Sequence, residues 1–99
     1  MDIAEIKKAV KRAMRGHPLS SSIANISLFG SRLDGSAGKK SDVDLLVKFR
    51  VTPTLFDLVD LQDALTKYLG RTAHVSTPGS LSKYIRRDVL RSAKKLYER

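Results

Sequence analysis

The sequences SLFGS at residues 27–31 and SDVDLLV at residues 41–47 decide the fold of this chain. The first is an apolar strand that ends in a Gly-Ser turn, and the second is a strand that begins with two carboxylates. Asp42 and Asp44 lie two residues apart, so an extended strand places both side chains on one face. Glycine lets a backbone approach a ligand, and a helix start behind it presents free N–H groups to an anion. A turn that approaches phosphate, beside carboxylates that can hold a divalent metal, indicates nucleotide chemistry.

The rest of the chain alternates between helical and extended patterns. Apolar residues recur at helical spacing in three segments, and runs rich in β-branched residues lie between them. The predicted helices cover residues 2–16, 53–69 and 81–97, and the predicted strands cover 23–29, 42–49 and 71–76, with a short helix at 31–35. We therefore predict an α+β fold, in which a small mixed sheet of about three strands is packed by helices. Residues 1–99 are expected to form a single domain.

Composition narrows the classes of function. Nineteen Lys and Arg against ten Asp and Glu give a net charge of +9, which favours acidic partners such as nucleotides, nucleic acids or acidic proteins. The chain has no cysteine, so disulfides and thiolate metal sites are excluded. No apolar run approaches the ~18 residues that span a bilayer, and the N-terminus lacks the apolar core of a signal peptide. We expect a cytoplasmic protein without a membrane partner.

The motif residues resemble a known family. LFGSR at 28–32, Gly35 and SDVDLLV at 41–47 are similar to the signature of the minimal nucleotidyltransferase (MNT) domain of the DNA polymerase β superfamily. The similarity extends over nearly the whole chain in length and element order. It implies a polymerase β-like nucleotidyltransferase core and a Mg²⁺-dependent transfer of a nucleoside monophosphate, with ATP as the substrate, to a hydroxyl.

The same resemblance assigns roles to residues. Gly30 and Ser31 would bind the triphosphate, and Asp42 and Asp44 would bind metal and act in catalysis. Arg32 and Ser41 are further candidates for nucleotide binding. Arg32 is not a signature residue, and its charge is equally well explained as that of a solvated loop.

One position departs from the family pattern. The family has a third carboxylate on the next strand, and this chain has His74 there, within AHVSTP at residues 73–78. Histidine is a poor ligand for Mg²⁺, but it can serve as a general base near neutral pH. We therefore include His74 among the candidate catalytic residues. Three interpretations stay open: an altered but active site, a degenerate site that binds nucleotide without transferring it, or an engineered substitution.

The resemblance also implies a partner. Stand-alone members of this family pair with HEPN-domain ribonuclease toxins and act as antitoxins by adenylylating a toxin tyrosine. The leading hypothesis is thus a protein adenylyltransferase in a hetero-oligomeric toxin–antitoxin system. The alternative is a catalytically impaired antitoxin that neutralises its partner by direct contact. A third hypothesis, nucleotidyl transfer to a small molecule or RNA, rests on basic charge alone, which is weak evidence for nucleic-acid binding.

Overall fold

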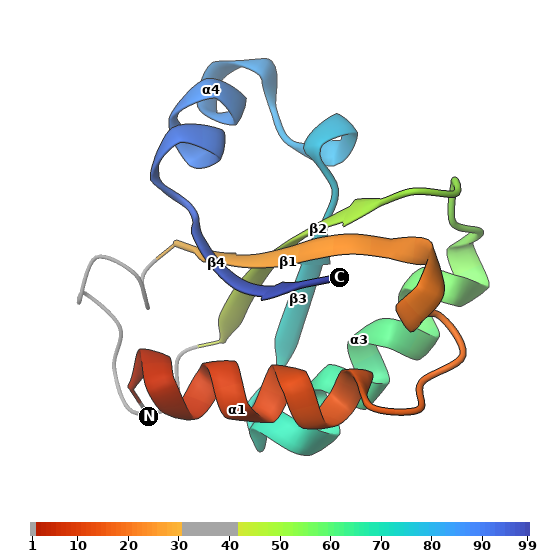
Figure 1. Ribbon diagram of the computed structural model, residues 1–99. Coiled ribbons are helices and arrows are strands. Elements are labelled where there is room, and N and C mark those ends of the chain that lie inside the picture. Colours follow the sequence, from red (N-terminus) through yellow and green to blue (C-terminus); the bar gives the residue numbers. More distant parts are fainter. Residues whose placement is uncertain (1, 31–41) are drawn as a thin grey trace.

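The computed structural model describes residues 2–30 and 42–99, which form three α-helices, four strands and two single-turn 3₁₀ helices (Figure 1). In chain order these are α1 (Ile3–Met14), a 3₁₀ turn (Ser20–Ser22), β1 (Ile23–Phe29), β2 (Val43–Phe49), α3 (Leu55–Leu69), β3 (Ala73–Ser76), a 3₁₀ turn (Pro78–Ser80), α4 (Lys83–Ser92) and β4 (Lys94–Glu98). The short helix predicted at 31–35 lies outside the described residues. None of the helices in the described ranges combines the length and apolar character needed to cross a bilayer.

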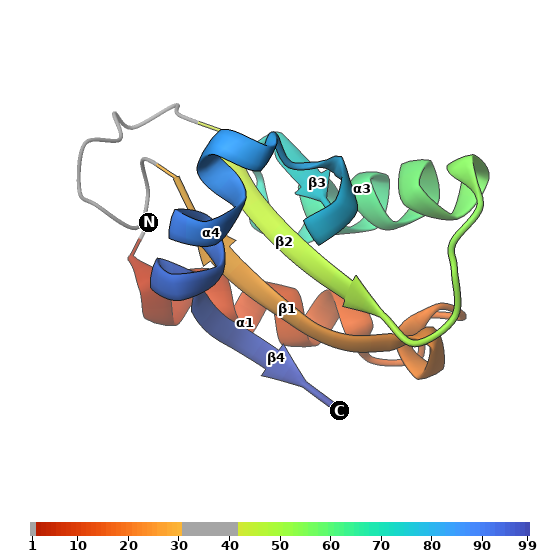
Figure 2. The ribbon, with the colours of Figure 1, turned by 90° about the horizontal axis from the view of Figure 1, so that it is seen from above.

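The strands form one mixed sheet in the order β3-β2-β1-β4. Strand β1 pairs antiparallel with both β2 and β4, whereas β2 pairs parallel with β3. Helices α1 and α3 cover one face of the sheet, and α4 lies on the other side (Figures 1 and 2). The predicted α+β class and the mixed sheet are confirmed, with a fourth strand added at the free edge of β1.

Helices α1 and α3 begin at reciprocal caps. Asp2 accepts a hydrogen bond from the Glu5 N–H at 2.8 Å, and Thr54 accepts one from the Asp57 N–H at 3.1 Å. In each case the acidic side chain three residues into the helix accepts the N–H of the capping residue, which satisfies donors that a helix start leaves free. Helix α3 ends at Gly70, whose φ of 68° is a left-handed conformation typical of a helix C-terminus.

The hydrophobic core lies between the sheet and these two helices. Its largest fully buried side chains come from helices α1 and α3 and from strands β1, β2 and β4: Ile6, Val10, Met14, Ile23, Ile26, Leu28, Val43, Leu45, Leu61, Leu65 and Leu96. Each such side chain contributes about 1.5–3 kcal/mol when removed from water. Along β2, alternate residues point into this core, so Asp44, between Val43 and Leu45, points to the opposite face.

The predicted helix over residues 81–97 is wrong in its C-terminal part. Helix α4 ends at Ser92, and Ala93 is extended, with φ −59° and ψ 136°. Residues 94–98 form β4, which pairs with β1 and buries Leu96. The spacing of Leu81, Ile85, Val89, Ala93 and Leu96 fits a helix, but as a strand residues 94–98 form hydrogen bonds with the backbone edge of β1 that β2 leaves open. Tertiary hydrogen bonding therefore overrides the helical pattern here.

Candidate nucleotide-transfer site

Three strand ends meet at one end of the sheet. Because β1 is antiparallel to β2 and β3 is parallel to it, the end of β1 lies beside the starts of β2 and β3. Phe29 pairs with Asp44, and Asp44 pairs with His74 on the other side. Phe29, Asp44 and His74 thus form a row across β1, β2 and β3, with Asp44 in the middle.

Asp42 and His74 contact each other directly. The Nε2 atom of His74 lies 2.6 Å from Oδ2 of Asp42, and the side chains are 52% and 50% exposed. With its proton on Nε2, the imidazole donates this hydrogen bond to the carboxylate, and Nδ1 can then accept a proton. The backbone supports the contact, since the Val43 N–H donates to the Thr72 carbonyl at 2.9 Å and ties the two strand starts together.

Strand β3 is held in place by side chains of α3. The Ala73 N–H donates to the Thr66 hydroxyl at 3.0 Å, and the Val75 N–H donates to the Gln62 side-chain oxygen at 3.2 Å. These bonds flank His74 and satisfy N–H groups at the outer edge of the sheet. Thr66 and Gln62 are therefore positioning residues that sequence reasoning did not identify. Their spacing of four along α3, next to its apolar stripe, is the one local signal by which they could have been found.

Gly30 packs against Asp44. Its φ of +81° lies in the left-handed region, which favours glycine. A Cβ at this position would overlap Oδ2 of Asp44 and would lie 3.1 Å from its Cγ. The turn after β1 thus passes close to the carboxylate, and a side chain at residue 30 would displace it.

Burial raises the pKa of the Asp44 carboxyl above its ordinary value. The positive charge of a protonated His74 opposes this increase, whereas the neighbouring Asp42 carboxylate adds to it. Two nearby carboxylates, one of them partly removed from water, form a region of negative potential that favours a bound cation.

The donor atoms of this site fit Mg²⁺ only in part. Within residues 2–30 and 42–99, no three His, Asp or Glu side chains are grouped so that they could hold a metal by themselves. Mg²⁺ is commonly bound by one or two carboxylates together with water and substrate phosphates, and Asp42 and Asp44 match that requirement. His74 already contacts Asp42, and its nitrogen is a poor Mg²⁺ ligand. The two aspartates are thus the residues that would hold the ion.

The structure brings together four of the predicted site residues: Gly30, Asp42, Asp44 and His74. The other three, Ser31, Arg32 and Ser41, lie outside the described residues.

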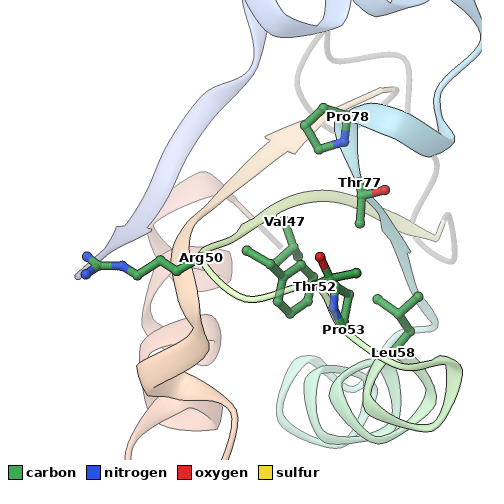
Figure 3. Close-up of a pocket in the computed structure, with 8 residues that line it drawn as sticks. Val47, Arg50, Thr52, Pro53, Leu58, Thr77 and Pro78 are labelled. Carbon is green, nitrogen blue, oxygen red and sulfur yellow. The ribbon is translucent and has the colours of Figure 1, made fainter.

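A pronounced hollow in the described part of the chain lies away from this site. It has a volume of about 420 Å³ and opens at the far end of β2, between Val47, Pro53, Leu58 and Pro78 (Figure 3). The carboxylates stand at the start of β2 and this hollow at its end, so the hollow is not part of the candidate site.

Comparison with known proteins gives this geometry a family. The model of the nucleotidyltransferase domain family matches residues 3–96. The protein adenylyltransferase MntA of Thermococcus cleftensis is 36% identical over 69 residues, which are 70% of each chain. A solved structure described as a minimal nucleotidyltransferase has a TM-score of 0.76 and 30% identity, and the match covers 94% of both chains.

A toxin–antitoxin complex is similar in fold. In the structure of a tri-AMPylated Shewanella oneidensis HEPN toxin bound to its MNT antitoxin, the matching chain has a TM-score of 0.69 and 19% identity. The match covers 98% of this chain and 73% of that one. The family model spans nearly the whole sequence, and the described motif residues meet at one end of the sheet. The chain therefore belongs to the nucleotidyltransferase domain family.

Proposed function

We propose that this protein transfers AMP from ATP to a tyrosine hydroxyl of a HEPN-domain toxin, and thereby acts as an antitoxin. The observation that carries the proposal is the Asp42–His74 contact beside Asp44, because it places a proton acceptor next to two carboxylates. Similarity to an adenylyltransferase, and to an antitoxin bound to an AMPylated HEPN toxin, supports the choice of nucleotide and acceptor.

The carboxylates have the role of holding Mg²⁺. Asp44 and Asp42 would provide oxygen ligands, and the contact with His74 uses only Oδ2 of Asp42. When bound, the ion neutralises phosphate charge and orients the triphosphate for attack at its α-phosphorus. The close passage of Gly30 beside Asp44 brings backbone, rather than a side chain, to the place where the triphosphate would lie.

The chemical step requires one proton transfer. The tyrosine oxygen forms a bond to the α-phosphorus. The bond between the α-phosphorus and the oxygen that bridges the α- and β-phosphates breaks, and pyrophosphate leaves. We assign His74 as the base that accepts the hydroxyl proton on Nδ1. Asp42, bonded to Nε2, fixes the orientation of the ring and stabilises the imidazolium that forms. This assignment gives the histidine at the third carboxylate position a catalytic use.

Ser31, Arg32 and Ser41 stay predictions as nucleotide-binding residues. A hetero-oligomer with the toxin and a cytoplasmic location stay predictions as well.

A binding-type antitoxin is the second candidate. It is favoured by the presence of His74 where the family has a third carboxylate, because the site then has two carboxylates for Mg²⁺ and a ring nitrogen is a poor Mg²⁺ ligand. In that case the protein neutralises its toxin by stoichiometric contact, and the site keeps its family residues but does not catalyse transfer.

One experiment separates the two candidates. The protein is incubated with Mg²⁺, ATP labelled at the α-phosphate and the HEPN-domain product of the adjacent gene, and toxin neutralisation is measured in parallel. Transfer of label, together with loss of both transfer and neutralisation in Asp42→Asn plus Asp44→Asn, supports the enzyme. Neutralisation that survives this double substitution, without transfer by the wild type, supports the binding-type antitoxin.

A further inference from the structure

Apolar side chains gather at the surface where α3 begins. Val51, Leu55, Phe56 and Val59 are 64%, 74%, 82% and 50% exposed. Singly exposed apolar residues are common, but four within nine positions of the sequence form a patch of the kind that marks an interaction site.

The patch continues into two hollows. The hollow of about 420 Å³ at the end of β2 is bordered by Leu58 and Pro53 (Figure 3), and a second, of about 220 Å³, is bordered by Leu55, Leu58 and Val59. Because Leu58 lines both, the two hollows adjoin each other along one flank of α3, and the larger is also lined by Arg50. Hollows of this kind receive the side chains that anchor an interface.

The exposed side of α3 next to these hollows, formed by Phe56, Val59, Asp60 and Asp63, has a charge opposite to that of the whole protein. Phe56, Val59, Asp60 and Asp63 follow the i, i+3, i+4, i+7 spacing that aligns residues on one side of a helix. Asp60 and Asp63 are both exposed. Helix α3 has three acidic residues and only Lys67 as a base, in a chain whose net charge is +9. The surface therefore fits a partner that is both apolar and basic.

Helix α4 has these properties. None of its ten residues is buried, and two of its larger apolar side chains, Tyr84 and Leu90, are 81% and 41% exposed. Arg87 and Arg91 are exposed too, and their spacing of three and seven from Tyr84 puts all three on one side. A helix this short is marginal in water without packing of an apolar side, so α4 has stability to gain from a partner.

We propose that the exposed side of α3, formed by Phe56, Val59, Asp60 and Asp63, binds helix α4 of a second copy of this chain. In one copy, α4 and α3 lie on opposite sides of the sheet (Figures 1 and 2), so a molecule cannot cover its own α3 with its own α4. In the complex, Tyr84 and Leu90 cover the apolar patch, while Arg87 and Arg91 face Asp60 and Asp63. This proposal is independent of the proposed transfer activity and of the toxin.

Charge reversal on each side tests the pairing. One variant carries Asp60→Lys and Asp63→Lys, and the other carries Arg87→Glu and Arg91→Glu. Sedimentation equilibrium of the protein without toxin should show self-association of the wild type. Each double variant should weaken it by about tenfold or more, and an equimolar mixture of the two variants should restore it. Phe56→Asp should weaken association through the apolar part of the same contact.

The matched control is Lys7→Glu plus Lys8→Glu on α1, which changes the net charge as much as the α4 variant does. It should leave association unchanged, and circular dichroism should show that all variants are folded. A wild type that is monomeric throughout the concentration range would overturn the proposal, as would a mixture that fails to associate. If the variants instead lose only toxin binding, the surface belongs to the toxin and the second-copy proposal is wrong.

Discussion

The carboxylate of Asp44 occupies the space that a Cβ on Gly30 would fill. These residues come from adjacent antiparallel strands, and residue 30 follows directly after the Phe29–Asp44 pair of the register. The left-handed φ of Gly30 turns the chain past the carboxylate at this point. Two independent constraints therefore require glycine at position 30: its backbone conformation and the close approach of Asp44. Substitutions can measure the two separately.

We expect Gly30→Ala to destabilise the protein more than the same change at other left-handed glycines. Gly16 and Gly70 have φ of +73° and +68°, and an added Cβ at either would meet nothing within 4 Å. Gly16→Ala and Gly70→Ala should therefore cost about 1–2 kcal/mol from backbone strain alone. Gly30→Ala should cost about 1–2 kcal/mol more, because Asp44 must move, as measured by urea unfolding.

A double-mutant cycle isolates the contact with Asp44. In an Asp44→Ala background, the cost of Gly30→Ala should fall to that of the two control glycines. An unchanged cost in this background would mean that backbone conformation alone requires glycine at position 30.

Substitutions of His74 test its assignment as the base. His74→Ala should reduce AMP transfer by about 10²–10⁴-fold, the usual contribution of general-base catalysis. His74→Asn keeps an N–H donor for Asp42 but has no proton acceptor of comparable basicity, so its transfer should be equally low. Recovery of transfer in His74→Asn would show that His74 only positions Asp42.

His74→Asp tests whether the natural site is impaired. With a third carboxylate beside Asp42 and Asp44, this variant has more negative charge to attract Mg²⁺. Transfer that does not exceed the wild-type level would agree with a histidine base. A large gain over weak wild-type transfer would favour the binding-type antitoxin. Mg²⁺ binding, measured by calorimetry, should tighten in either case.

Part of this site could be predicted from local sequence. The i, i+2 spacing of Asp42 and Asp44 and the glycine after an apolar strand are short-range signals, and both residues of the pair precede or begin β2 as expected. The Asp42–His74 contact spans 32 residues, and it depends on a parallel pairing that no local pattern specifies. The supporting roles of Thr66 and Gln62 depend on the same pairing.

The error at the C-terminus has a similar origin. Lys94–Glu98 continues a helical apolar spacing, and only the open edge of β1 makes it a strand. Of the apolar residues that fit this helical spacing, Ile85 is 48% exposed on α4, whereas Leu81 and Leu96, which lie outside α4, are buried. The expectation of a single domain over residues 1–99 stays a prediction.

Asp44→Asn should stabilise the metal-free protein at neutral pH. The folded-state pKa of Asp44 is raised by burial, so the folded protein favours the protonated form, and ionisation costs stability. The free energy of unfolding of the wild type should therefore fall, relative to the variant, as pH rises from the reference value of 3.8 through the raised pKa. We expect Asp44→Asn to be more stable than the wild type at pH 7 and to have little advantage below pH 3.8, as measured by urea unfolding in EDTA.

Exposed Asp60→Asn is the control for this pH dependence, and it should show no comparable gain at low protein concentration. A variant that is less stable than the wild type at pH 7 would mean that the carboxylate makes a favourable contact that outweighs its desolvation.

Leu96 should be essential to the fold although it lies only three residues from the end of the described chain. Its side chain is 1% exposed and packs in the core from β4, so Leu96→Ala should cost about 2–4 kcal/mol. Leu55→Ala, at a residue that is 74% exposed, should change stability by about 0.5 kcal/mol or less in dilute solution. The β4 amides that donate hydrogen bonds to β1 should also be protected from hydrogen exchange. Equal small costs for the two substitutions, without protection, would contradict a C-terminal strand and restore the helix that the sequence pattern predicts.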